Sequence, residues 1–142
     1  NEIASALGIC QLEKLDKSNK AREGLTKLYT KLLENVKFVR IPFKKMRGKL
    51  SYHIFPILLD ERVDREKFMD FLKKKGVQTS IHYPPIHLFS YYKNKFGYKE
   101  GLLPVTECIG KTEVTLPLHP LLKKDDIAYI VNQIIEFGKT LK

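Results

Sequence analysis

The sequence predicts a single two-layer α/β domain, in which helices pack on a small mixed or antiparallel β-sheet. Helical and extended patterns alternate along the 142 residues in the order helix, strand, strand, helix, strand, two short helices, strand, helix. A long helical pattern begins the chain, an amphipathic helical pattern ends it, and no internal repeat is visible. A chain of this length can bury roughly 65–70% of its unfolded surface, which is enough for a core of its own.

The start of the chain has the apolar spacing of one long helix. Apolar residues recur every three to four positions from Ile3 to Leu15 and again from Ala21 to Leu32. An unbroken helix of this length would measure about 50 Å, whereas a compact domain of this size has a radius of gyration of about 14 Å. We therefore expect a break near residues 16–19 or at Gly24, or packing of the first half on something outside the domain. The small residues of the run IASALGIC favour the second alternative.

The middle of the chain predicts three strands and one helix. The strands are expected over residues 36–43, 50–59 and 77–83, and the helix over residues 60–76. Pro56 places the second strand at an edge or a bulge, because proline cannot donate to the ladder. Acidic residues at its start, lysines at its end and Gly76 beyond it delimit the helix. The third strand must end at Pro84 and Pro85.

The last third of the chain predicts further helices joined by an extended piece. These segments are a short helix or ordered loop over 86–101, a helix over 104–114, an extended piece over 115–122 and an amphipathic helix over 123–142. Pro104 suits the first turn of the second of these helices. The whole chain, residues 1–142, is therefore expected to form one domain.

The composition weighs against several classes of function. The net charge is +10, but only five of the 26 basic residues are arginine, the side chain preferred for reading base edges. No apolar run approaches the ~20 residues of a membrane span, and the two cysteines have neither metal nor disulfide-scaffold spacing. We expect a cytoplasmic protein that binds neither nucleic acid nor membrane. The alternative is a basic binding module for nucleic acid or an acidic partner, without enzymatic activity.

No motif in the chain predicts a complete catalytic or metal site. The glycines are isolated, no nucleophile elbow is present, and the four histidines lack zinc spacing. His53 is predicted to be a hydrogen-bonded core or sheet-edge residue, and His119, between prolines, to be structural or on the surface. His82 differs because it ends a strand, where α/β proteins place side chains that contact ligands. For His82 the residues alone leave contact with a ligand and packing equally open, and Tyr83 and His87 follow it as weaker candidates.

Several stretches of the chain, in order and covering nearly all of it, are similar to one known family. They are NEIASALGICQLEKLD, SYHIFPILLD, DREKFMDFLKKKGVQTSIHY and GVQTSIHYPPIHLFSYYKNKFGYKEGLLPVTECIGKTEVTLPLHPLL. Together they resemble the DegT/DnrJ/EryC1/StrS family of pyridoxal 5'-phosphate (PLP)-dependent aminotransferases, which act on nucleotide-linked keto-sugars. The departures are small: Ser5 stands where the family usually has Ala, and Thr106 where Ala is common before Glu107. The details are similar to the subgroup that aminates UDP-linked 4-keto-6-deoxy sugars.

The resemblance implies that residues 1–142 are the C-terminal small domain of a fold-type I aminotransferase. In that family the large domain binds PLP through a Schiff-base lysine, and none of the 21 lysines here lies in that context. The expected partners are the protein's own large domain and a second subunit in a homodimer. The expected substrates are glutamate and a nucleotide-linked keto-deoxy sugar. The resemblance assigns no catalytic, cofactor-binding or metal residue to this chain, which is expected to be inactive by itself.

The same resemblance places the segment IHYPP at the mouth of the active site. His82 and Tyr83 are the predicted substrate contacts, and His87 is a lesser one. A diphosphate-linked sugar needs hydrogen-bonding groups and aromatic faces, and a turn stiffened by proline presents both with little ordering cost. A further alternative is a family member that acts in regulation or dehydrates a sugar instead of transferring an amino group. Only the residue at the Schiff-base lysine position, which this sequence does not include, would distinguish such a protein from an aminotransferase.

Overall fold

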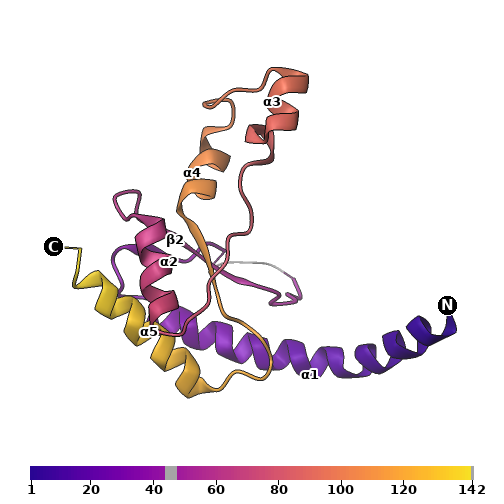
Figure 1. The fold of residues 1–142 in the computed structure, drawn as a ribbon. Helices are drawn as coiled ribbons and strands as arrows, with labels where there is room; N and C mark the ends of the chain where they lie inside the picture. The colour runs from indigo at the N-terminus through magenta and orange to yellow at the C-terminus, as the bar shows by residue number, and fades with distance from the viewer. Residues whose placement is uncertain (44–47, 142) are drawn as a thin grey trace.

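The computed structural model describes residues 1–43 and 48–141, which form an α/β domain with two projecting parts (Figure 1). The elements are α1 (Glu2–Leu32), β1 (Val39–Arg40), β2 (Phe55–Leu59), α2 (Arg65–Lys74), the 3₁₀ helix η1 (Ile86–Leu88), α3 (Ser90–Phe96), α4 (Pro104–Thr112), β3 (Glu113–Leu116) and α5 (Lys124–Gly138). The predicted fold class is confirmed, including the long first helix and the last helix. None of the described helices is both long and apolar enough to cross a membrane.

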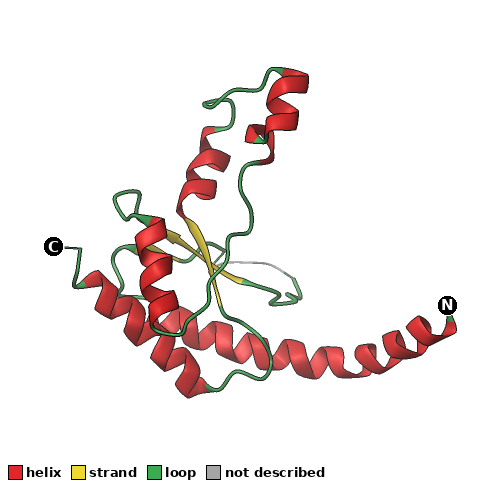
Figure 2. Ribbon diagram, viewed as in Figure 1, coloured by secondary structure: helices red, strands yellow, loops and turns green. Residues whose placement is uncertain are grey.

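The sheet has three antiparallel strands among the described residues, in the order β1, β2, β3 (Figure 2). Pro56 lies in the central strand, so its expected place at an edge or a bulge is corrected. It stands opposite Thr115, whose N–H and C=O both bond Ser80 on the far side, so the missing N–H of Pro56 removes no bond to β3. On the other side β1 pairs only with Leu58 and Leu59, which leaves Pro56 beyond its end.

The predicted strand over 77–83 does not form, and a single antiparallel bridge joins Ser80 to Thr115 in its place. The next ladder position would pair His82 with Glu113. There the backbone N–H of His82 donates to the carboxylate Oε2 of Glu113 at 2.8 Å, instead of to a strand carbonyl. A side chain therefore takes the place of the ladder bond, and the chain turns away into Pro84 and Pro85.

Other predicted boundaries also differ from the structure. The helix predicted over 60–76 spans only Arg65–Lys74, and the helix predicted over 123–142 ends at Gly138. The segment 36–43 contributes only β1, because turn bonds from Val36 and Val39 keep its first half compact. The segment 50–59 becomes a strand only at Phe55. The helix predicted over 104–114 ends at Thr112, and the β-branched residues Val114 and Thr115 belong to β3.

Helix α1 is continuous over 31 residues, so the first of the two expected alternatives, a break, does not occur. Its second half packs against α5 and buries Leu25 and Tyr29. Its first half extends away from the domain, and Ile3, Leu7 and Leu12 are 76%, 61% and 69% exposed (Figure 1). The second of the two expected alternatives, packing on something outside the domain, therefore stays a prediction.

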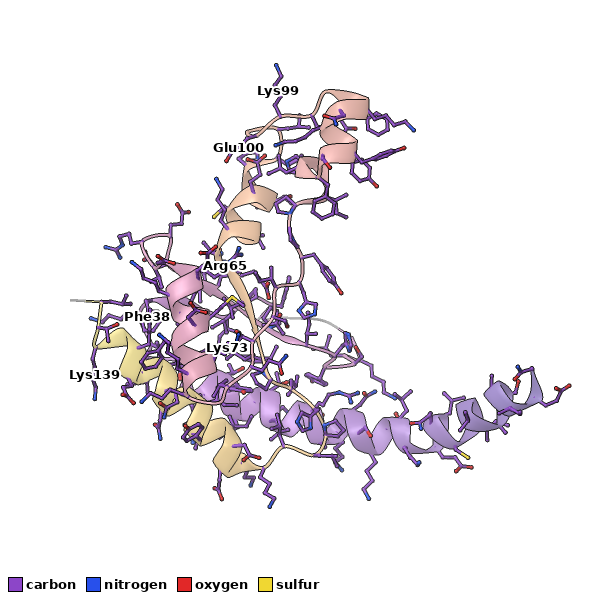
Figure 3. The ribbon with its side chains drawn as sticks, viewed as in Figure 1. Phe38, Arg65, Lys73, Lys99, Glu100 and Lys139 are labelled. Carbon is purple, nitrogen blue, oxygen red and sulfur yellow. The ribbon has the colours of Figure 1, made fainter. Side chains whose placement is uncertain are left out.

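The core lies between the sheet and the layer formed by α2, α5 and the second half of α1. Tyr29 stacks on Phe55 with ring centroids 4.6 Å apart, and Phe68 meets Phe137 edge to face at 5.1 Å. Phe38 closes the end of this layer, where it contacts Phe68 and lies against Gly138 (Figure 3). Each fully buried side chain of this kind contributes roughly 1.5–3 kcal/mol by leaving water.

The second projecting part, hereafter the projection, comprises residues 86–112 with η1, α3 and α4 (Figure 1). Lys99 and Glu100 lie at its tip, and Glu100 pairs with Lys111 of α4 at 2.7 Å (Figure 3). Arg65, at the start of α2, holds its base because its guanidinium donates to the carbonyl of Gly110 (Figure 3). The projection leads directly into the first residue of β3, Glu113, which is hydrogen-bonded to His82.

Candidate functional site

His82 lies where the chain leaves the sheet and crosses to the projection. Its ring is half-buried and contacts the ring of Tyr83 edge to face, with centroids 4.9 Å apart. Tyr83 is 74% exposed, and Pro84 and Pro85 follow it directly. The two predicted contacts are thus adjacent, and a proline-stiffened turn presents both.

A short hydrogen-bond chain from β3 supports His82. Its Nδ1 lies 2.9 Å from the Oγ1 of Thr115 and 3.4 Å from the Oγ of Ser80. The hydroxyl of Thr115 donates to the Oε1 of Glu113 at 2.5 Å, while the Oε2 of Glu113 accepts the backbone N–H of His82. Glu113 and Thr115 are 3% and 5% exposed. Both oxygens of a buried carboxylate are therefore used to hold one residue.

A cavity of about 630 Å³ opens beside His82, and three of the chain's four histidines line it. Besides His82 these are His53 and His119, both exposed on the surface of the domain. Hydroxyl, amide and carboxylate side chains complete the polar lining, and they are Gln78, Thr79, Ser80, Thr115, Asp126 and Tyr129. We call this the histidine cleft. It can bind a polar ligand through hydrogen bonds.

The convergence of His53 and His119 follows from the register of the sheet. Phe55 begins β2 and pairs with Leu116, which ends β3. His53 precedes the first by two residues and His119 follows the second by three, so an antiparallel pair brings them to one end. The predicted core or sheet-edge role of His53 is corrected, because the residue lies exposed outside the strand. The surface position predicted for His119 is confirmed.

His87 occupies a different environment, inside the projection. It is 6% exposed, and its Nε2 lies 2.9 Å from the Oε1 of Glu107 on α4. Glu107 also accepts the backbone N–H groups of Gly101 and Leu103. These bonds, first that from Gly101 and then that from His87, lower the pKa of Glu107 to about 2. The pair joins η1 to α4 and to the loop before it.

Tyr83 and His87 share a second cavity of about 570 Å³, which lies along the projection and is lined mainly by aromatic and apolar side chains. His82 does not line this cavity, and neither Tyr83 nor His87 lines the histidine cleft. The structure therefore separates the three predicted residues between two cavities, one lined by His82 and the other by Tyr83 and His87. Substrate contact by any of them remains a prediction.

Sequence reasoning missed the residues that support the site, above all Glu113 and Thr115. Both were assigned to the end of a helix or to an extended piece after it. The signal that could have found them is the alternation in the run EVTL, which places two polar residues on one face of a strand. Glu107 gave no comparable signal, because its partners come from a loop whose path depends on the whole projection.

The described lysines and metal-ligating side chains are scattered over the domain. A lysine that binds PLP needs a shielded pocket, whereas every lysine within residues 1–43 and 48–141 is exposed and none lines the histidine cleft. Within the same residues no group of three His, Cys, Asp or Glu side chains is arranged to hold a metal. The site, as far as it is described, is a surface for polar and aromatic contacts.

Comparison with known proteins identifies the family. The model of the DegT/DnrJ/EryC1/StrS aminotransferase family matches residues 1–135, and the chain belongs to this family. It is 32% identical over 145 residues to the UDP-4-amino-4,6-dideoxy-N-acetyl-beta-L-altrosamine transaminase of a Campylobacter jejuni strain, covering 100% of this chain and 38% of the relative. It is 35% identical over 136 residues to the protein MJ1066 of Methanocaldococcus jannaschii, covering 94% of this chain and 35% of that protein.

Solved structures show the same relationship. Helicobacter pylori PseC, an aminotransferase involved in the biosynthesis of pseudoaminic acid, matches with a TM-score of 0.91 and 25% identity, over 99% of this chain and 38% of PseC. The aminotransferase TlmJ from Streptoalloteichus hindustanus matches with a TM-score of 0.88 and 27% identity, over 100% of this chain and 37% of TlmJ. The chain thus spans between 35% and 38% of the length of these relatives.

Proposed function

We propose that the chain is the C-terminal small domain of a PLP-dependent aminotransferase, which moves an amino group from glutamate to a nucleotide-linked keto-deoxy sugar. The observation that carries the proposal is the family match over residues 1–135, together with a relative named as a UDP-amino-sugar transaminase that aligns along the whole chain. The fold agrees with that of PseC, an aminotransferase, over 99% of this chain. A cytoplasmic location accompanies this proposal.

In this proposal PLP and the lysine that binds it belong to the large domain of the same protein. The described lysines are all exposed, which supports this division of labour. We therefore expect the small domain to be inactive by itself. The first half of α1, with Ile3, Leu7 and Leu12 exposed, supplies an apolar surface for packing against the large domain. A second subunit completes the proposed homodimer.

The proposed role of the small domain is to bind and orient the nucleotide sugar. His82 presents a ring nitrogen beside a polar cleft, and Tyr83 presents an exposed aromatic face with a hydroxyl group. The two prolines after Tyr83 keep both rings ordered before binding, which lowers the entropic cost of the contact. For His87 we propose a lesser part at the wall of the second cavity, since its Nε2 already pairs with Glu107.

The experiment compares the 142-residue chain with a longer protein that includes the sequence encoded upstream of it. We expect the longer protein to show the absorption band of bound PLP and to aminate a UDP-linked 4-keto-6-deoxy sugar with glutamate, and the chain alone to do neither. A longer protein with neither bound PLP nor amino transfer would overturn the proposal. A longer protein that binds PLP but dehydrates the sugar would overturn the assigned reaction.

Variants of the longer protein test the proposed contacts. His82→Ala and Tyr83→Ala are each expected to raise the KM for the nucleotide sugar by about two- to tenfold, which is the range for one hydrogen bond. The KM for glutamate should not change. Tyr91→Ala, which removes an exposed tyrosine of α3, is the matched control. Equal KM values for the sugar in all three variants would contradict the assigned contacts.

A further inference from the structure

We propose that Glu113 and Thr115 are positioning residues that fix the tautomer of His82, with the proton on Nδ1, so that Nε2 is presented as a hydrogen-bond acceptor. The ligand group that such a nitrogen recognises is a donor, a hydroxyl or an N–H, and not a phosphate oxygen. Only the assignment of that hydroxyl to a nucleotide sugar rests on the proposed function. The tautomer itself follows from the contacts of the described residues.

The first step concerns the single hydroxyl proton of Thr115. The Oγ1 of Thr115 lies 2.5 Å from the Oε1 of Glu113 and 2.9 Å from the Nδ1 of His82. When Glu113 is ionised its oxygens only accept, so at this distance the hydroxyl proton points to Glu113. The Oγ1 then offers a lone pair to His82, and the nitrogen facing it must be the donor. The Nδ1 of His82 is therefore protonated.

The second step explains why the carboxylate does not turn to another arrangement. The Oε2 of Glu113 accepts the backbone N–H of His82 at 2.8 Å, so each oxygen has its own donor. Glu113 and Thr115 lie two positions apart on the same face of β3, and both are paired with residues of the neighbouring strand β2. The backbone of Thr115 exchanges two hydrogen bonds with Ser80, of 2.8 and 3.2 Å. The acceptor for Nδ1, the Oγ1 of Thr115, therefore lies on a strand whose residues are all buried.

The third step gives the chemical consequence at the histidine cleft. When Nδ1 of a neutral imidazole carries the proton, Nε2 has a free lone pair and accepts a hydrogen bond. Phosphate oxygens also accept, so they are poor partners for this nitrogen, whereas a sugar hydroxyl is a good one. The other titratable groups that line this cleft are His53, His119, Asp126 and Tyr129. His82 therefore selects hydroxyl-bearing ligands in its neutral form.

Nitrogen NMR of the histidine rings in the ¹⁵N-labelled 142-residue protein tests the tautomer directly. We expect neutral His82 to show a protonated Nδ1 and an unprotonated Nε2. A wild-type ring with the proton on Nε2 would overturn the proposal. The measurement needs neither PLP nor sugar, so a protein that fails to transfer amino groups leaves this result unaffected.

Three variants of the two supporting residues sharpen the test. Glu113→Gln should invert the tautomer: its carbonyl oxygen is needed by the N–H of His82, its amide then donates to Thr115, and the hydroxyl turns to donate to Nδ1. Thr115→Val should give a mixture of tautomers, and Thr115→Ser should restore the wild-type spectrum. Thr112→Val removes a neighbouring buried hydroxyl that donates to Cys108, and it serves as the control.

If Glu113→Gln and Thr115→Val both fold and both keep the wild-type tautomer of His82, the proposed role of Glu113 and Thr115 is contradicted. If either variant fails to fold, the wild-type and Thr115→Ser spectra still decide the question. In the longer protein, Glu113→Gln should raise the KM for the nucleotide sugar by about two- to tenfold and leave the KM for glutamate unchanged. A purely structural role would not invert the tautomer.

Discussion

Two histidines on either side of the same pair of prolines are each linked to a buried glutamate, in two different ways. His82 reaches Glu113 through the hydroxyl of Thr115, and its half-buried ring lines a polar cleft. His87 contacts Glu107 directly and is 6% exposed. Because the hydroxyl of Thr115 lies between the ring and the carboxylate, the Nδ1 of His82 is held while its Nε2 remains available to a ligand. His87 is instead buried, and its contact with Glu107 connects η1 to α4.

The two regions also differ in what holds them together. The hydrogen-bond partners of His82, Glu113 and Thr115, belong to β3, and the sheet packs on a core of long-range apolar contacts. Around His87 the support is a set of hydrogen bonds between segments close in sequence, all centred on Glu107. We call the sheet with α1, α2 and α5 the body. The stability of the body should therefore depend on buried apolar volume, and the stability of the projection on the carboxylate of Glu107.

The largest expected effect is on the body. Phe68→Ala removes a fully buried ring that contacts Phe38 and Phe137, and it should lower the free energy of unfolding by about 3–5 kcal/mol. Denaturant unfolding measures this loss. Phe96→Ala removes a ring of the projection that is 52% exposed and stacks on Tyr92 and Tyr98, and it should lower the free energy of unfolding by only about 1 kcal/mol. Comparable losses in the two variants would erase the distinction between the regions.

The next effect concerns the contact between α4 and the prolines. A Cβ at Gly110 would lie 2.5 Å from the Cδ of Pro85, so Gly110→Ala forces rigid groups apart and should cost about 1–3 kcal/mol. Gly24→Ala, at an exposed position of α1 with nothing within 4 Å, should instead stabilise by about 0.5–1 kcal/mol. Denaturant unfolding of both variants compares the signs. A stabilising Gly110→Ala would show that the two segments are not held in contact.

A smaller, local effect should follow acidification of the projection. The pKa of Glu107 is about 2 in the folded protein, below its ordinary value of 4.5, because the bonds from Gly101 and His87 favour the carboxylate. The stability that it contributes is therefore complete above pH 4.5 and is lost as the pH falls toward 2. Exchange of the Gly101 amide hydrogen should accelerate across this window. Glu107→Gln should show fast exchange throughout, and an unchanged protection pattern in this variant would contradict the role of the carboxylate.

The smallest expected effect is at Tyr83. Because its ring is 74% exposed, Tyr83→Ala should change the free energy of unfolding by no more than about 0.5 kcal/mol. Thermal or denaturant unfolding checks this value. A large loss would mean that the ring supports the fold, and it would weaken the proposal that the ring is free to meet a substrate.

Local signals predicted the presence of the helices better than their bounds. Gly76 follows α2 with a φ of 75° and Pro104 opens α4, as predicted, whereas the cap at Asp64 starts α2 five residues after the predicted start at residue 60. Each signal acts within one turn of chain, so it is readable without knowledge of the fold. Strands were predicted less well, since a strand exists only where a partner is available, and the segment 77–83 lost its partner after one bridge.

The sequence by itself determined the α/β class, the family, and the importance of His82 and Tyr83 as candidates, because these rest on residue types and short-range order. Tertiary structure alone decided what surrounds them. The antiparallel register joined His53 and His119 to the cleft of His82, and the side chain of Glu113 replaced a ladder bond to hold that ring. These partners lie between 29 and 37 residues from His82 in the sequence, and only the pairing of distant segments brings them close to it.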